Sequence, residues 1–301
     1  GSVGPMTWGA MLGEQLDFYR NAHFWPRIQG VTDEDYLWEP AAGAWSLRPG
    51  PDGPWVLDQL PLDPPVAPVT TIAWRVVHVG RDVLGKRARA FFAPGEVPDD
   101  VVMYDDAYWP EAPPTAADGA LAFLTEAYEL WRDGVASLDD DALLRTLGSR
   151  GGPYSDDTMA ALVLHINREV MAHGAEICLL RDLYRAQLDA EDPLVVAALV
   201  DDADAVGRLL ADGASVRPSL LAEAAGRQQW DIVRALVEHG VDVSAGNPSA
   251  LHFAAGAGDR EAARYLVAHG ADLTAVDPQW GMPPSGWAGF FGHADLAAEL
   301  Q

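Results

Sequence analysis

One short phrase occurs three times in the last third of this 301-residue chain and constrains its fold more than any other feature. Each copy runs Leu-x-x-x-Gly and continues for three residues, and the copies cover residues 209–216, 236–243 and 266–273. Their glycines, Gly213, Gly240 and Gly270, are 27 and 30 residues apart. A unit this short cannot bury its own apolar face, so neighbouring units must stack. The spacing therefore predicts a helical solenoid over residues 192–301.

The residues around each phrase support paired helices. An Ala-Ala pair precedes each copy, at residues 197–198, 224–225 and 254–255. Small side chains let paired helices approach closely, and the glycine after each outer helix suits a left-handed C-cap. The segment Ser249-Ala250-Leu251-His252-Phe253-Ala254-Ala255 resembles the Thr-Pro-Leu-His-x-Ala-Ala signature of ankyrin repeats. A fourth copy starts near Gly286, so we expect about three ankyrin repeats and a partial fourth.

The preceding part of the chain has helical periodicity punctuated by Pro and Gly. Helices are predicted at residues 7–24, from 70 or 71 to 92, at 116–138 and from a Ser155-Asp156-Asp157 cap to residue 184. A Pro-rich stretch at residues 26–68 separates the first two helices. Four long helices with two long connections are typical of a four-helix bundle, here predicted for residues 6–188. The expected fold class is all-α.

Charge and composition exclude several classes of function. The chain has 45 acidic and 20 basic residues, a formal net charge of −25. This surface repels nucleic acid and anionic membranes, and no apolar run approaches the roughly 20 residues needed to cross a bilayer. With 49% apolar residues the chain is not a disordered acidic segment. The single cysteine, Cys178, indicates a reducing compartment, so we expect a soluble, cytoplasmic protein with Cys178 as a buried structural thiol.

Three polar residues recur at four-residue intervals on the predicted fourth helix: His165, Glu169 and His173. His165 and His173 would lie about 12 Å apart, too far to share one ion, whereas neighbours in this stripe meet above the same turn. His78 on the second helix is a candidate for a further ligand. Two histidines and a carboxylate suit zinc or a similar divalent ion with open positions for water or substrate. The alternative is that these histidines are ordinary core or rim residues.

The bundle also resembles a known superfamily. Residues 165–184, Trp45-Ser46-Leu47-Arg48-Pro49 and Trp74-Arg75-Val76-Val77-His78 are similar to segments of the DinB-like superfamily. This resemblance implies a metal ion bound by one residue of the second helix and an i, i+4 pair of the fourth. It places His78, Glu169 and His173 at the ligand positions. His165, Arg168 and Glu176 lie near the ligand turn and could support the ligands, and no catalytic residue is assigned.

The superfamily includes thiol-dependent S-transferases and the mycothiol-dependent maleylpyruvate isomerase. The resemblance therefore implies a divalent metal, zinc first, and a low-molecular-weight thiol such as mycothiol as co-substrate. Many relatives have a His-His pair where this chain has Ala172-His173, and the ankyrin array replaces the additional C-terminal domain of the isomerase.

These features lead to one expected function and two alternatives. We expect a metal-dependent transferase or isomerase acting on a small molecule, with the ankyrin array binding a protein partner or mediating self-association. The same site could instead activate water as a hydrolase. A third hypothesis is a non-catalytic scaffold whose array recruits a partner.

Overall fold

The chain forms two compact units, residues 1–185 and 186–301. The computed structural model describes residues 7–50, 53–59 and 68–301. Met6, the predicted start of the first domain, and parts of the Pro-rich stretch lie outside the described residues. The division between the units falls inside α8 (Met159–Glu191), three residues before the predicted end of the first domain at residue 188.

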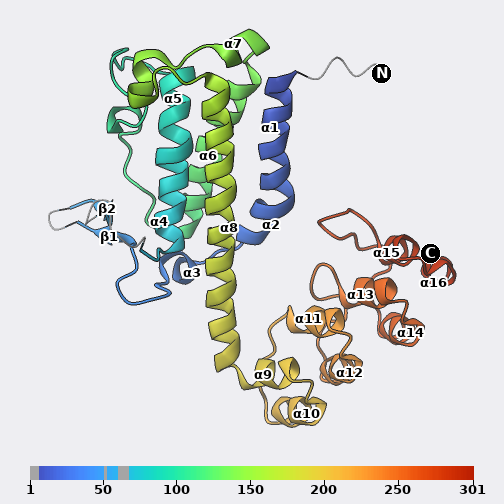
Figure 1. The fold of residues 1–301 in the computed structure, drawn as a ribbon. Helices are drawn as coiled ribbons and strands as arrows, with labels where there is room; N and C mark the ends of the chain where they lie inside the picture. Colours follow the sequence, from blue (N-terminus) through green and yellow to red (C-terminus); the bar gives the residue numbers. More distant parts are fainter. Residues whose placement is uncertain (1–6, 51–52, 60–67) are drawn as a thin grey trace. The chain divides into compact units, whose positions relative to one another are not determined.

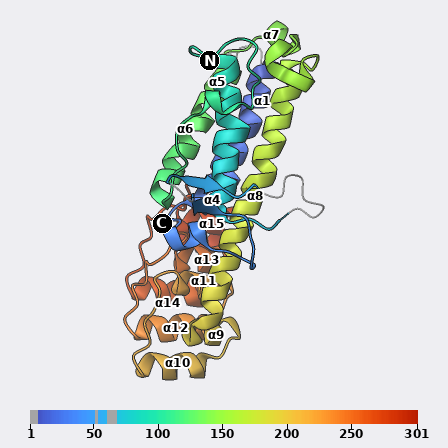
Figure 2. The same ribbon diagram turned by 90° about the vertical axis from the view of Figure 1, so that its left-hand side faces the viewer.

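Unit 1 is built from four long helical rods. The rods run side by side in Figures 1 and 2. The first two rods each contain a π-helical segment, and the last is the part of α8 that belongs to this unit. The rods are α1 (Trp8–Phe18) with η1 (Tyr19–Phe24) and α2 (Trp25–Ile28), then α4 (Ile72–Val77) with η2 (His78–Gly85) and α5 (Lys86–Phe92), then α6 (Ala117–Ala136), and α8. The four-helix bundle and the all-α fold class are confirmed.

Threonine caps start three of these rods. Thr7 accepts a hydrogen bond from Ala10 N, and Thr71 accepts one from Trp74 N. For α8 the predicted cap at Ser155 is wrong, because residue 155 still closes a turn with Gly152 O. Thr158 Oγ1 instead accepts from the Ala161 N–H at 3.2 Å. The predicted end at residue 184 is also wrong, because α8 continues until the segment before Pro193, where helical backbone is disfavoured.

The connections contain short elements that the sequence analysis did not predict. They are α3 (Asp33–Leu37), β1 (Leu47–Pro49), β2 (Trp55–Leu57), η3 (Asp106–Tyr108), α7 (Asp140–Leu144) and η4 (Gly148–Tyr154). The strands pair antiparallel, with Leu47 opposite Leu57. Just before β1, Trp45 N donates to Val69 O at 2.8 Å, and Thr71 N donates to Trp45 O at 2.9 Å. The hairpin connection is thereby tied to the first turn of α4, in which Trp74 stacks on His78.

The core of unit 1 packs aromatic side chains against helix backbone. Trp131 on α6 is fully buried, and its ring lies 5.5 Å from that of Phe92 at the end of α5. Phe92 covers Gly134 so closely that a Cβ at residue 134 would lie 2.0 Å from the ring. Glycine at this position therefore sets how near α5 and α6 can approach.

Unit 2 consists of helix pairs. They are α9 (Pro193–Leu199) with α10 (Ala203–Ala211), α11 (Leu220–Gly226) with α12 (Trp230–Glu238), α13 (Ala250–Ala257) with α14 (Arg260–Ala268), and α15 (Pro284–Phe290) with α16 (Ala294–Glu299). The predicted alanine pairs are buried between helices. Gly213, Gly240 and Gly270 have φ near +90°, as expected for the residue that ends each outer helix.

The signature histidine of the array has a structural role. His252 is fully buried, its Nδ1 lies 2.9 Å from Ser249 Oγ, and its Nε2 lies 3.2 Å from Met282 O. It therefore links α13 to the loop before α15. No helix among the described residues of either unit has the length and apolar character needed to cross a membrane.

Candidate metal centre

Two rods of the bundle bring the three predicted ligands together. His78 is the first residue of η2, and Glu169 and His173 lie one turn apart on α8. His173 Nε2 is 3.4 Å from Glu169 Oε2, and the rings of His78 and His173 meet edge to face with centroids 5.1 Å apart. Two donors bound to one tetrahedral ion at about 2.1 Å are themselves about 3.4 Å apart. The spacing of the Glu169–His173 pair therefore suits a shared ion.

The other nitrogen of His173 faces Glu176. The distance from His173 Nδ1 to Glu176 Oε2 is 2.7 Å. A carboxylate only accepts hydrogen bonds and a guanidinium only donates them, so Nδ1 would donate to Glu176 and would accept from Arg75, whose Nη1 is 2.9 Å away. Arg75 Nη1 also lies 3.0 Å from the same carboxylate oxygen, which ties Glu176 to α4. The opposite ring nitrogen, Nε2, is directed at the Glu169 carboxylate.

His78 is oriented in a similar way. Its Nδ1 approaches Asp82 Oδ2 at 3.5 Å, and its ring stacks on Trp74 with centroids 5.0 Å apart. Burial alone would raise the pKa of Asp82, but hydrogen bonds from His78 and Arg81 and the charges of Arg81 and Lys86 hold that pKa well below its usual range. Asp82 is thus ionised and contacts Nδ1 of His78. The other ring nitrogen, Nε2, is therefore the one that remains to bind a metal ion.

The remaining predicted residues cluster around Glu169. His165 Nδ1 and Arg168 Nε lie 3.8 and 3.9 Å from Glu169 Oε1, and Arg168 Nη2 lies 2.8 Å from His165 Nδ1. Burial lowers the pKa of His165, and the charge of Glu169 offsets this in part. Arg168 is largely exposed. Glu176 therefore contacts the imidazole of His173, a predicted ligand. His165 and Arg168 instead lie near Oε1 of Glu169, whereas Oε2 faces His173.

Close packing keeps this turn of α8 against the first rod. A Cβ at Gly174 would lie 2.5 Å from the hydroxyl oxygen of Tyr19, and that hydroxyl donates to Met171 O at 3.0 Å. Asn167, two turns before Gly174, is buried and donates to Leu12 O at 2.9 Å. Asn167 therefore holds the helix in register and has a structural role. Cys178 is buried, as predicted.

The donor set fits a divalent ion in its chemistry, since two imidazoles and one carboxylate are typical zinc ligands. In the part of the chain that the structure describes, however, no group of three or more His, Cys, Asp or Glu side chains is already arranged to hold an ion. The structure thus brings His78, Glu169 and His173 together as neighbours. The sequence analysis missed Arg75 and Asp82, although the i, i+4 spacing from His78 to Asp82 was visible.

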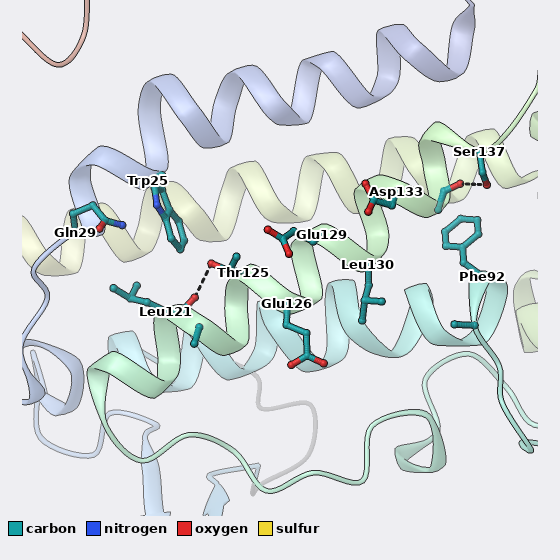
Figure 3. Close-up of a pocket in the computed structure, with 13 residues that line it drawn as sticks. Trp25, Gln29, Phe92, Leu121, Thr125, Glu126, Glu129, Leu130, Asp133 and Ser137 are labelled. Carbon is teal, nitrogen blue, oxygen red and sulfur yellow. Dashed lines mark hydrogen bonds between the residues drawn. The ribbon is translucent and has the colours of Figure 1, made fainter.

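A cavity of about 850 Å³ lies along α6, and none of the predicted metal ligands lines it. Figure 3 shows Trp25 and Gln29 at one end and Phe92 at the other, with acidic side chains of α6 between them. Its lining contains no histidine or cysteine. Its chemistry therefore does not match the donor set gathered between η2 and α8.

The fold and the site define an all-α protein in which the second and fourth rods of a helical bundle bear a facing His, Glu and His, followed by stacked helix pairs. Comparison with family models matches the DinB superfamily over residues 56–177 and ankyrin repeats, in three copies, over residues 186–277. The chain thus combines a DinB superfamily domain with ankyrin repeats, and the predicted fusion is confirmed. A search of curated proteins finds no match.

Proposed function

We propose that the DinB domain is a metal-dependent enzyme in which His78, Glu169 and His173 hold a divalent ion, zinc first. The observation that carries the proposal is the approach of His173 Nε2 to Glu169 Oε2 at 3.4 Å, with Glu176 Oε2 lying 2.7 Å from the other ring nitrogen, Nδ1. Such a carboxylate behind a histidine ligand is a common support in metal sites.

Three protein ligands leave room for a further one, so the site is catalytic in type. When bound, a divalent ion supplies Lewis acidity that lowers the pKa of a thiol or of water at the open position. Glu176 and Arg75 hold the His173 ring through contacts with Nδ1, and Asp82 orients His78. Trp74, stacked on His78, shields one side of that imidazole from water. These contacts preorganise the donors before any substrate arrives.

The reaction we favour is thiol transfer or isomerisation. A low-molecular-weight thiol of the mycothiol type would attack an electrophilic carbon of a small-molecule substrate. This choice is supported by the resemblance of residues 165–184 to the DinB-like superfamily, which includes thiol-dependent S-transferases. Hydrolysis of a small molecule by the same donor set is the alternative enzymatic reaction.

Metal content of purified protein tests the proposal. We expect about one zinc per chain in the native protein and loss of that zinc in His78→Ala and His173→Ala. His23→Ala is the matched control, because His23 is an exposed histidine of the same unit that no predicted ligand contacts. Absence of metal from native protein, even after incubation with zinc, would refute the metal centre.

A second assay separates the reactions. Zinc-loaded protein is incubated with mycothiol and an aryl halide, and conjugate formation is followed by absorbance. Conjugate above the rate of His173→Ala supports thiol transfer. No conjugate with several thiols, together with cleavage of ester or amide substrates, would establish the hydrolase instead. Stoichiometric metal with neither reaction would favour the scaffold hypothesis.

The ankyrin repeats indicate protein–protein interaction. We propose that the array binds a protein partner or a second copy of this chain. Size-exclusion chromatography with light scattering tests self-association directly. A monomer at all concentrations leaves a separate partner as the ligand of the array.

A further inference from the structure

A second cavity of unit 1, of about 600 Å³, borders the Glu169 turn. The side chains of Arg87 on α5 and of His165 and Arg168 on α8 line it together with apolar residues such as Leu147 and Leu162. Its volume is in the usual range for small-molecule sites, roughly 300–1,000 Å³. The cavity therefore combines an apolar wall with a cationic one, in a chain whose net charge is −25.

Arg87 is the unusual member of this wall. Its Nε is buried without a hydrogen-bond partner. Among the described residues, Arg87 is also the one partly or fully buried arginine that forms neither a hydrogen bond nor an ion pair, whereas Arg75 and Arg181, for example, are paired with Glu176 and Asp35. Burial lowers the pKa of Arg87, with Asp82 and Glu169 opposing the shift from a distance. An arginine nevertheless stays charged in proteins.

The Arg87 side chain is partly buried and has no anionic partner among the residues that the structure describes, and an anion seated beside its guanidinium group would supply one. The guanidinium group has a planar fork of donors that matches a carboxylate in two parallel hydrogen bonds. The apolar residues opposite suit a hydrocarbon body. Asp157 also lines the cavity, and its negative charge disfavours a doubly charged phosphate. A single carboxylate on an apolar skeleton fits this lining best.

We propose that this cavity binds the carboxylate of a small organic acid through Arg87. His165 and Arg168 contact Glu169 as well as lining the cavity, so the bound acid lies next to the candidate metal centre. Its assignment as the substrate rests on the proposed function. Binding of the carboxylate does not rest on the proposed function, because Arg87 is not one of the predicted metal ligands.

Isothermal titration with 3-phenylpropionate and its uncharged isostere, 3-phenylpropionamide, tests the proposal. We expect native protein to bind the acid about ten-fold or more tightly than the amide, since hydrogen bonds to a charged group contribute about 1.5–3 kcal/mol. Arg87→Met should remove this preference. Arg185→Met removes the same charge from an exposed arginine of α8 outside the cavity lining and should leave the preference intact.

Arg87→Lys gives a further check, because it keeps the charge and loses the fork. Its affinity for the acid should lie between those of native protein and Arg87→Met, and circular dichroism verifies that all variants fold. Equal binding of acid and amide by native protein, or unchanged acid binding in Arg87→Met, would overturn the proposal. The proposal would also be overturned if native protein, Arg87→Lys and Arg87→Met bound the acid with equal affinity.

The titrations are run on metal-stripped and on zinc-loaded protein so that the two proposals can fail separately. Preference for the acid in native protein and its loss in Arg87→Met, without any zinc binding, would refute the metal centre and retain the carboxylate cavity. Stoichiometric zinc with no preference for the acid would refute the cavity and retain the metal centre.

Discussion

Gly134→Ala should destabilise the bundle, although alanine is normally the better helix former. Gly134 lies in the last turn of α6 and faces Phe92. An added Cβ would lie 2.0 Å from Phe92 Cδ2 and 2.3 Å from Cγ. Carbon atoms pack at about 3.5–4.0 Å, so the ring would have to retreat by about 1.5–2 Å. Retreat displaces a ring that also packs on the fully buried Trp131.

The magnitude follows from two opposing terms. Forcing an extra carbon into a packed core costs about 1–3 kcal/mol, and occasionally more. Replacing glycine by alanine inside a helix gains about 1 kcal/mol, and less in a last turn. The contact at residue 134 involves the body of the ring, so the cost falls at the upper end of its range. We expect a net loss of about 2 kcal/mol in the free energy of unfolding of unit 1.

Gly13→Ala is the matched control. Gly13 lies inside α1, and a Cβ there would meet no atom within 4 Å. The same substitution should therefore stabilise unit 1 by about 0.5–1 kcal/mol. Because the two units have separate cores, hydrogen exchange resolved by peptide is the appropriate assay. Equal or slower exchange in Gly134→Ala than in native protein would refute the packing argument.

Three further predictions concern buried polar groups and the thiol. Burial alone would raise the pKa of Asp277, but hydrogen bonds from Trp287 Nε1 and three backbone N–H groups outweigh it and lower that pKa. The difference in free energy of unfolding between native protein and Asp277→Asn, measured in urea, should therefore be largest above about pH 4. It should shrink as the pH falls through the lowered pKa. Arg181→Ala should lower the stability of unit 1 by about 3 kcal/mol in the same assay, because buried Arg181 donates to Gln29 O and faces the buried Asp35 carboxylate; a loss below 1 kcal/mol would contradict this role. Burial raises the pKa of Cys178, so iodoacetamide should label it slowly in native protein and rapidly in urea at the same pH, as measured by mass spectrometry.

Much of the architecture was accessible from sequence because periodic patterns report it. The three glycine phrases and alanine pairs predicted the repeats, and the amphipathic stretches predicted the four rods. The cap at Ser155 was wrong because an acidic turn after a polar residue resembles an N-cap, while a 3₁₀ segment, η4, delays α8 until Thr158. The β1–β2 hairpin was missed because three-residue strands carry too few residues to show alternation.

The candidate site was only partly accessible. Spacing on one helix showed that Glu169 and His173 share a face, and the resemblance added His78 from another rod. That Asp82 and Glu176 each face an imidazole Nδ1 depends on side-chain rotamers and on how two rods pack, which spacing does not report. Nor did the sequence indicate that Arg87 lacks a hydrogen-bond or ion-pair partner among the described residues, because that depends on which side chains surround it in the folded protein.

The π-helical segment that begins at His78 has a consequence for how chains of this type can diverge. A π turn holds an additional residue compared with a regular helix, and each residue of a regular helix rotates the chain by about 100°. Deleting one residue from η2 would let the rod become continuous α-helix and would turn His78 by about that angle relative to Arg87. One of the two side chains would then leave the face directed at α8. The length of this rod, as much as the identity of its residues, keeps the imidazole and the guanidinium group on the face directed at α8, and substitution scans would not detect that requirement.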